Sequence, residues 1–487
     1  MQAGGAAPSS APSGVEVPLD LLYRLKPSDN QLLRATRYDR IFTSESPTTN
    51  TPSLNVIRIN VVSSNFMDLK EGRLSFDFKA GTSTSNLGNQ FDGGAHCIIK
   101  RLRILNREGA EIERCESYNL YHTILQQYQD SLKDALQDSI NNGCPDGMNV
   151  GTVQTITSTV DSNVHATAGA GVIYPRTRYR QEDSTILKDN VVRRFEFKLK
   201  NGWFNPVGGK YLPPDIMWTL ELTLDATVAC MVGATTTADY SISNVTLKIP
   251  VINIVDPGFS SVVEDLRMAP HSWRFNSYKL YQAANASTGA AASSSVTISD
   301  RSMSLNAFLC VSRLKADLSL ITAWPLSKRS VQAITSWQFT IGSEQFPPQA
   351  VPAFSDTTTA GTAAWAAATT SVNYPIASSA TVNIASTLNE VLRVFPNMSV
   401  IDGHSFCESS NNNGTGLLAL NLKAHLSSTS SLGGMDTKRN AVPITFTWGQ
   451  NAISAERQWD FFALCDVMVD VMPPNSYGMG GLMQASS

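Results

Sequence analysis

The residues of this 487-residue chain that could do chemistry are few, and their spacing is too wide for a local catalytic or metal site. Two histidine–cysteine pairs have the local spacing of metal ligands: His96 with Cys97, and His404 with Cys407. A tetrahedral zinc site needs a second clustered pair, and neither has one nearby in the sequence. These four residues are predicted to be ordinary loop or strand residues, and no metal ion or other cofactor is predicted.

Carboxylates with the residue types of general acid–base chemistry occur side by side at Glu182–Asp183 and Glu264–Asp265. Both pairs adjoin predicted loops or linkers, where acidic side chains are usually solvated. The Gly208–Tyr211 segment is not a phosphate-binding loop, because Phe204 stands where that motif requires its first glycine. Metalloprotease and serine-hydrolase motifs are also absent from the sequence. The sequence therefore predicts no catalytic residue and no enzyme.

The seven cysteines are odd in number, and no two of them have CxxC spacing. Wide spacing favours free thiols in a reducing compartment over a disulfide framework. Met1–Ser13 lacks the apolar core of a signal peptide, and no apolar run approaches the ~20 residues of a membrane span. We expect the chain to be made and folded in the cytosol. The cysteines are Cys97, Cys115, Cys144, Cys230, Cys310, Cys407 and Cys465.

Charged residues make up only 16% of the chain, against about 25% in typical domains. Such a chain either has a surface of neutral polar residues or hides much of its surface against partners, as an assembly subunit does. The net charge of −3 does not favour a coat held on nucleic acid by overall charge. Basic residues near the N-terminus alternate with acidic ones, which favours a solvated arm over a genome-binding arm.

Strict two-residue alternation of apolar and polar side chains recurs along nearly the whole chain. In Arg73–Lys79, for example, Leu74, Phe76 and Phe78 share one face, and polar residues occupy the other. Such strands indicate antiparallel sheets packed face to face. The same pattern is found in Arg194–Leu199, Trp218–Asp225, Trp337–Ile341 and Ile444–Trp448.

Other segments complete an all-β pattern with one long helix. Apolar residues at four-residue intervals from Leu120 to Ile140 predict a helix at Ser117–Asn142. Its stripe is most simply a core contact, with a partner-binding helix as the alternative, and a short helix is predicted at Thr387–Val394. Further strands are predicted at Leu54–Val62, Cys97–Leu105, Val191–Lys200, Met217–Ala229, Tyr240–Ile254, Val296–Ile298, Leu305–Ser312, Leu417–Leu426, Pro443–Trp448 and Trp459–Met472.

The chain is too long to fold around a single hydrophobic core. The turn signal Asp256–Gly258 divides the chain near its middle. Two long, nearly uncharged loops are predicted at Asp146–Gly171 and Ser355–Ser386. The predicted organisation is an N-terminal arm at 1–50, a first domain at 51–256, a linker at 257–272, a second domain at 273–472 and a C-terminal tail at 473–487.

The order of these segments resembles the double jelly-roll major capsid proteins shared by tailless bacteriophages, adenoviruses, virophages, polinton-like viruses and large algal DNA viruses. Ile98–Leu105, Gly109–Glu113 and the following helix resemble a strand–turn–strand–helix passage of that family. Tyr211–Pro214 resembles a proline-marked entry to a late strand, and Trp337–Ser343 followed by Pro347–Pro348 resembles a strand and turn of the second jelly roll. The resemblance spans residues 50–472 and is nearest to polinton-like virus or virophage capsid proteins.

This resemblance implies two tandem eight-stranded jelly rolls, with one long accessory helix in the first. It implies a major capsid protein that forms pseudo-hexagonal homotrimeric capsomers in the virion of an icosahedral DNA virus, made in the host cell cytosol. Implied partners are further copies of the chain, neighbouring capsomers, and minor capsid and penton proteins. The long loops would lie at the capsomer top. The N-terminal arm would tie capsomers together or face the interior, with an inner membrane or the genome as a further candidate partner.

Two other classes of function use a pair of β-sandwiches. A glycan-active enzyme would need an acid cluster or a metal set at the domain junction. The junction offers only Glu264–Asp265 and His271. A sugar-binding protein would need clustered exposed aromatic residues, and Trp203, Trp273 and Trp365 are widely separated in the sequence.

Overall fold

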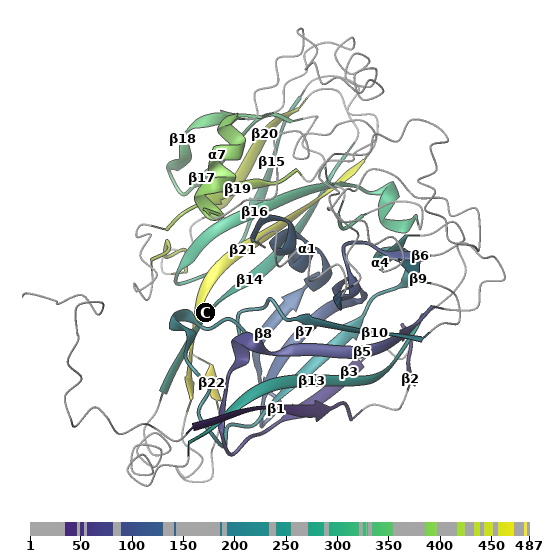
Figure 1. The fold of residues 1–487 in the computed structure, drawn as a ribbon. Coiled ribbons are helices and arrows are strands. Elements are labelled where there is room, and N and C mark those ends of the chain that lie inside the picture. The colour runs from purple at the N-terminus through teal and green to yellow at the C-terminus, as the bar shows by residue number, and fades with distance from the viewer. Residues whose placement is uncertain are drawn as a thin grey trace, which may run out of the picture.

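The computed structural model of the chain is built almost entirely of β-strands (Figure 1). It describes residues 35–45, 49–52, 56–80, 89–129, 141–142, 186–187, 192–232, 240–254, 271–286, 292–320, 325–327, 329, 334–353, 385–396, 416–423, 433–438, 443–450, 456–471 and 482–484. The predicted loop Asp146–Gly171 lies outside these residues, as do nearly all of the predicted loop Ser355–Ser386 and of the predicted linker. The last two residues of the second loop, Ala385 and Ser386, are helical. No described helix is long and apolar enough to cross a membrane.

The first half of the chain forms a sandwich of two antiparallel sheets. Its main strands are β1 Ala35–Thr43, β3 Val56–Val61, β5 Arg73–Lys79, β7 Ile99–Asn106, β8 Glu111–Glu116, β10 Val192–Lys198, β11 Trp218–Leu224 and β13 Ser241–Ile254. One sheet has the strand order β1-β13-β5-β10, and the other has the order β3-β11-β7-β8. The strand at Arg73–Lys79 has the predicted bounds, with Leu74, Phe76 and Phe78 buried.

The second half of the chain forms a second sandwich of the same kind. Its main strands are β14 His271–Asn285, β15 Ala292–Ile298, β16 Leu305–Leu314, β17 Ile334–Ile341, β18 Glu344–Pro352, β19 Leu418–Asn421, β20 Ile444–Gln450 and β21 Arg457–Val471. One sheet has the order β14-β21-β16-β19, and the other has the order β15-β20-β17-β18.

Both sandwiches have the connectivity of a jelly roll. If the eight main strands of each are numbered in chain order, one sheet is 1-8-3-6 and the other is 2-7-4-5, in both halves. In each half, a described helix lies between the fifth and sixth strands: α1 Tyr118–Gln129 in the first and α7 Ala385–Val394 in the second. The predicted pair of eight-stranded jelly rolls is confirmed, and α1 and α7 are topological counterparts.

Short elements extend these sheets. Strands that pair with β13 are β2 Thr49–Asn50 and β4 Phe66–Met67, and β22 Leu482–Gln484 pairs with β21. A small three-stranded sheet contains β12 Met231–Val232, β6 Asn89–Phe91 and β9 Ile186–Leu187. The remaining described helices are α4 Thr227–Cys230 and 3₁₀ turns at Leu69–Glu71, Ala95–Ile98, Val207–Gly209 and Ala316–Ser319.

Aromatic side chains fill the space between the two sheets of each roll. In the second roll, Phe339 stacks on Phe308 at a ring-centroid distance of 4.9 Å, and Phe446 meets Trp459 edge-on at 5.3 Å. In the first roll, Phe78 meets Phe91 edge-on at 4.9 Å. Phe78, Phe339 and Phe446 are inward-facing residues of predicted alternating strands, so the alternation identified part of both cores.

The first strand of each roll differs from the sequence expectation. Residues 35–43, placed in the predicted N-terminal arm, form β1, which pairs along β13 from Ala35 opposite Ile254 to Thr43 opposite Thr246. Only Phe42 of this strand is buried, so the segment shows no apolar alternation. The strand β14 begins at His271, within the predicted linker, and β22 lies in the predicted tail.

A second correction concerns Pro347 and Pro348, which resemble a turn in the sequence. Both lie inside β18, and the turn precedes them at Gly342, whose φ is 65°. Among the described strands, β18 pairs only with β17, so it is an edge strand, where proline costs no ladder hydrogen bond.

Candidate functional site

The contact between the two rolls is the best-defined polar and aromatic site among the described residues. We call it the inter-roll seam, and it joins α1, β8, Asp92 and residues 201–206 of the first roll to β14, β21, residues 325–327 and Arg329 of the second. Figure 1 shows α1 at the centre of the molecule, between the sheets of the two rolls. Every residue of α1 from Tyr118 to Tyr128 is buried, including the polar side chains Asn119, His122, Gln126 and Gln127.

Glu113 of β8 is a buried carboxylate at the centre of the seam. It accepts hydrogen bonds from Asn201 Nδ2 at 2.6 Å and from the backbone N–H groups of Gly202 and Trp203, each at 2.9 Å. A fourth bond comes from Ser277 Oγ of β14, in the other roll, at 2.9 Å. Burial raises the pKa of Glu113, and the four donors oppose that rise. The carboxylate thus ties one loop and two strands from both rolls together.

Aromatic rings close the seam on either side of Glu113. Trp203 lies 5.8 Å from Trp273 and 6.0 Å from Phe275, measured between ring centroids. On α1, the ring of Tyr121 lies 4.0 Å from that of Tyr278. These rings are at most 8% exposed, so the seam excludes water. Trp203 and Trp273 are 70 positions apart in the sequence, whereas the fold brings them together; Trp365 lies outside the described residues.

A second polar cluster joins the rolls near the C-terminal end of α1. Asp92 accepts hydrogen bonds from the backbone N–H groups of Leu326 and Ser327 at 2.5 and 3.1 Å. Arg329, which is fully buried, donates to the side chain of Gln127 on α1 and to the Leu326 carbonyl at 3.0 Å. Burial lowers the pKa of Arg329 to about 10. Asp92 and Arg329 are therefore both buried at this contact. Asp92 is bonded by residues of the second roll, and Arg329 is bonded to Gln127 of the first roll and to Leu326 of its own turn.

Two histidines that are 26 positions apart in the sequence stack against each other beneath the seam. The rings of His96 and His122 are 4.0 Å apart and nearly parallel, and both residues are buried. His96 Nε2 lies 2.9 Å from Thr123 Oγ1, and His122 Nδ1 lies 3.1 Å from Tyr118 Oη. Burial lowers the pKa of His96 to about 3 and that of His122 well below its usual value, and nearby Lys200 adds to both effects. Both imidazoles are therefore neutral in the folded chain.

The candidate residues that the structure describes do not converge on a catalytic or metal site. Cys97 lies beside His96 but donates to the Cys230 carbonyl at 2.8 Å. No group of three histidine, cysteine, aspartate or glutamate side chains that could hold a metal ion occurs among the described residues. The five described cysteines, which are Cys97, Cys115, Cys230, Cys310 and Cys465, are buried free thiols, as predicted. His404, Cys407, Glu182–Asp183 and Glu264–Asp265 lie outside the described residues.

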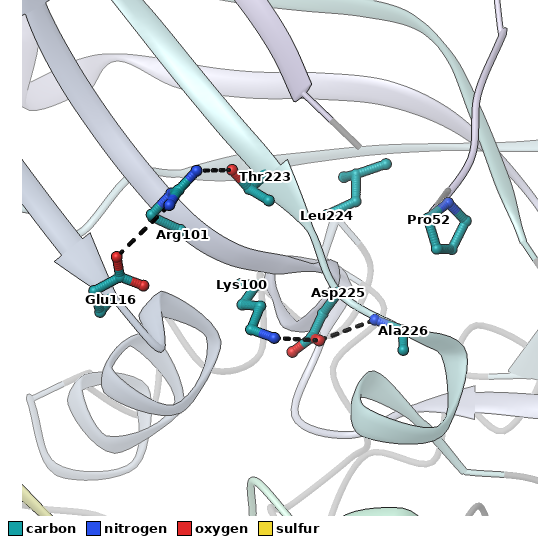
Figure 2. A pocket seen from close by; sticks show the side chains of 8 residues that line it. All are labelled: Pro52, Lys100, Arg101, Glu116, Thr223, Leu224, Asp225 and Ala226. Carbon is teal, nitrogen blue, oxygen red and sulfur yellow. Dashed lines mark hydrogen bonds and ion pairs between the residues drawn. The ribbon is translucent and has the colours of Figure 1, made fainter. Parts of the chain in front are cut away.

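An open pocket of about 460 Å³ lies on the outer face of β7 and β11. Figure 2 shows its charged side chains in opposed pairs: Lys100 lies 3.8 Å from Asp225, and Arg101 lies 3.9 Å from Glu116. Arg101 also donates to Thr223 Oγ1 at 3.2 Å. Since each cation faces a carboxylate, the pocket offers no excess charge to a ligand. The sequence did not single out these residues.

A ladder of ion pairs continues across the same sheet face. Glu221 of β11 accepts from Arg58 of β3 at 3.0 Å and from Arg103 of β7 at 2.8 Å, and Arg103 also contacts Glu111 of β8 at 2.7 Å. The two arginines hold the pKa of Glu221 below its usual value against the effect of burial. Four neighbouring strands are thereby cross-linked by alternating charges.

Comparison with known proteins shows likeness in structure but not in sequence. No family model matches the sequence, and no curated protein matches it. A chain in the cryo-EM structure of the Sputnik virophage is similar over 98% of this chain and 95% of its own, with 12% identity and a TM-score of 0.54. A chain in the quasi-atomic model of the PBCV-1 virus capsid is similar over 94% of this chain and 98% of its own, with 9% identity and a TM-score of 0.53.

The chain has the double jelly-roll fold of viral capsid proteins. PBCV-1 VP54, fitted into a reconstruction of Sputnik, gives the same result, with 10% identity, a TM-score of 0.53, and coverage of 94% of this chain and 98% of VP54. The similarity extends over both rolls, so the double jelly roll is matched as one unit. In this chain, the inter-roll seam holds that unit together.

Proposed function

We propose that this chain is the major capsid protein of an icosahedral DNA virus and that it acts by self-assembly. In this proposal, three copies form a capsomer of six jelly rolls with a pseudo-hexagonal outline. Neighbouring capsomers, and minor capsid and penton proteins, are the further partners. The virion is its site of action, after synthesis in the cytosol of the host cell.

The observation that carries the proposal is the near-complete match of a tandem jelly roll to chains of viral capsids. The match includes both rolls and covers 94% of this chain against the PBCV-1 capsid chain. A fold alone does not establish a function, because one fold serves many. The seam gives a second argument for the proposal. Buried charges and aromatic rings hold the two rolls together, so the pair can act as one rigid subunit of an assembly.

The alternative glycan-active enzyme gains no support from the comparisons. Of its candidate junction residues, only His271 is described, and it pairs in register with Val471 as the first residue of β14. The sugar-binding alternative loses two of its three candidate aromatic residues, because Trp203 and Trp273 are buried in the seam.

Light scattering coupled to size-exclusion chromatography tests the proposal. At micromolar concentration, the purified chain should have three times the chain mass of 52.7 kDa. A chain that stays monomeric over the whole micromolar range would contradict the proposed capsomer.

A further inference from the structure

Cys97 and Cys230 are 133 positions apart in the sequence, yet their side chains are in contact in the first roll. Cys97 belongs to the 3₁₀ turn Ala95–Ile98, and Cys230 is the last residue of the single-turn helix α4. The Cys97 thiol donates to the Cys230 carbonyl oxygen at 2.8 Å, and the two thiol groups lie within hydrogen-bonding reach of each other. Two free thiols in contact have the arrangement from which a disulfide forms.

The backbone around the two cysteines explains why they meet. Asp225, which directly follows β11, donates its backbone N–H to the carbonyl of Ile98, the neighbour of Cys97, at 2.8 Å. Asp225 and Ala226, both labelled in Figure 2, connect β11 to α4. One turn of helix then returns the chain, so that Cys230 Sγ lies 3.3 Å from the Ala226 carbonyl oxygen. Strand pairing and one helical turn therefore hold the two thiols together.

The hydrogen bonds around Cys230 allow the Cys97 thiol to lose its proton without leaving a buried carbonyl unpaired. The Cys230 carbonyl accepts a second bond, from the backbone N–H of Asp92 at 3.0 Å. That bond involves neither thiol, so it remains when a disulfide forms. Removal of the S–H donor is tolerated because the acceptor keeps another partner.

The folded chain keeps both thiols in their unreactive form. Cys97 and Cys230 are fully buried, and burial raises the pKa of both thiols, that of Cys97 well above its usual value. The thiolate is the reactive form of cysteine, so the closed site reacts slowly. The element that must open is α4, a single helical turn that begins beside the exposed Ala226. One isolated turn is only marginally stable, so its opening costs far less than unfolding of the roll.

We propose that Cys97 and Cys230 form a redox-dependent disulfide, which is open in a reducing compartment and closes when the chain meets a small oxidant. In this step, two S–H bonds break and one S–S bond forms. The oxidant takes up both hydrogens and two electrons: a small disulfide becomes two thiols, and an azo compound becomes a hydrazine. This chemistry goes beyond the proposed function and does not depend on it. For a capsid made in the cytosol, the bond would close after release from the cell.

The disulfide would strengthen the first roll's side of the inter-roll seam. The segment between the two cysteines contains α1, β8 and residues 201–206. Asp92, which contacts the second roll through its carboxylate, is bonded directly to Cys230. The bond would also close a long loop in the unfolded chain, and this should lower the equilibrium constant for unfolding by about 100-fold.

Oxidation of the full chain by diamide, an azo compound, tests the proposal. The reduced, folded chain is treated with diamide, alkylated at acid pH to block the remaining thiols, and digested for mass spectrometry. We expect a peptide pair that joins Cys97 to Cys230, and a loss of two hydrogens from the intact mass. The midpoint of urea unfolding should rise after oxidation and return to its original value after treatment with dithiothreitol.

Serine variants separate this pair from the other thiols. Cys97→Ser and Cys230→Ser replace a thiol by a hydroxyl group that can donate the same hydrogen bond, so each should keep the circular dichroism spectrum of the unaltered chain. Each should lose both the linked peptides and the gain in urea resistance. Cys310→Ser is the matched control, because Cys310 is a buried free thiol in β16 of the second roll, and it should keep both.

Two results would overturn the inference. One is recovery of Cys97 and Cys230 only as separately alkylated residues after prolonged exposure of the unaltered chain to excess diamide, a result that needs no variant to fold. The other is a gain in urea resistance that persists in Cys97→Ser. The linked peptides are detected whatever the number of chains in the assembly. A chain that stays monomeric would therefore reject the proposed capsomer and leave this inference standing, and the reverse also holds.

Discussion

Glu113 and Ser277 belong to different jelly rolls and share a buried hydrogen bond, in which Ser277 Oγ donates to Glu113 Oε1 at 2.9 Å. The same carboxylate accepts three more bonds from residues 201–203. The relation between the two rolls is therefore fixed by a group that can neither be solvated nor lose its partners without a large loss of stability.

Glu113→Gln should destabilise the folded chain by about 3 kcal/mol, because the new amide N–H would face donors that need an acceptor. The measurement is urea unfolding at a fixed protein concentration. Glu111→Gln, on the same strand, is the control: its side chain is 32% exposed and pairs with Arg103, so the loss should stay within about 1 kcal/mol. Equal losses for the two variants would show that Glu113 has no special role in the seam.

Gly202→Ala should push the rolls apart. A Cβ atom at Gly202 would lie 2.3 Å from the Asn276 carbonyl oxygen and 2.4 Å from Phe275 Cδ2, both on β14. Because one of these atoms belongs to the backbone, the strand itself must move, and we expect a loss of at least about 3 kcal/mol in urea unfolding.

Gly109→Ala is the control for backbone strain without a steric clash. Gly109 has a φ of +82° and nothing within 4 Å of the added Cβ, so the expected cost is only about 1–2 kcal/mol. A Gly202→Ala chain as stable as the Gly109→Ala chain would contradict the close contact at the seam.

Acid should destabilise the chain through the stacked pair His96 and His122. Both pKa values are lowered in the folded chain, that of His96 to about 3, whereas histidines in the unfolded chain titrate near about 6.5. The unfolded chain therefore binds more protons as the pH falls below about 6.5. Each histidine should then remove about 1.4 kcal/mol of stability per pH unit.

The variant His122→Gln isolates this effect, because the difference between two chains cancels the carboxylates common to both. The plot of unfolding free energy against pH between 6.5 and 5 should be shallower for the variant by about 1 kcal/mol per unit on average, with the difference rising to about 1.4 near pH 5. Identical slopes would mean that His122 takes up no proton on unfolding in this range.

Most strands could be predicted because each roll buries one face of each sheet. Arg73–Lys79 alternates cleanly and was predicted with its observed bounds. The strand β1 was missed because only Phe42 is buried, and β18 was missed because Pro347 and Pro348 are typical of turns. Both are edge strands. Each has a paired strand on one side in the sheet, so its sequence is less constrained than that of a central strand.

The seam could not be predicted from the sequence for a different reason. Glu113 lies next to the buried Ile112 in β8, at a position that alternation assigns to the solvent side. It is buried because residues 201–203 of its own roll and β14 of the other roll, through Ser277, cover that side. The helix α1 was predicted from its apolar stripe, but its polar side chains Gln126 and Gln127 are buried as well. A pattern within one segment carries no information about which distant segment covers its outer face.

Electron microscopy of the purified chain can decide whether this tandem roll is a capsomer subunit, as proposed. The expected particles have a near-hexagonal outline and are built from three chains and six jelly rolls. Class averages that show single two-lobed particles, or closed assemblies with a different number of chains, would contradict it.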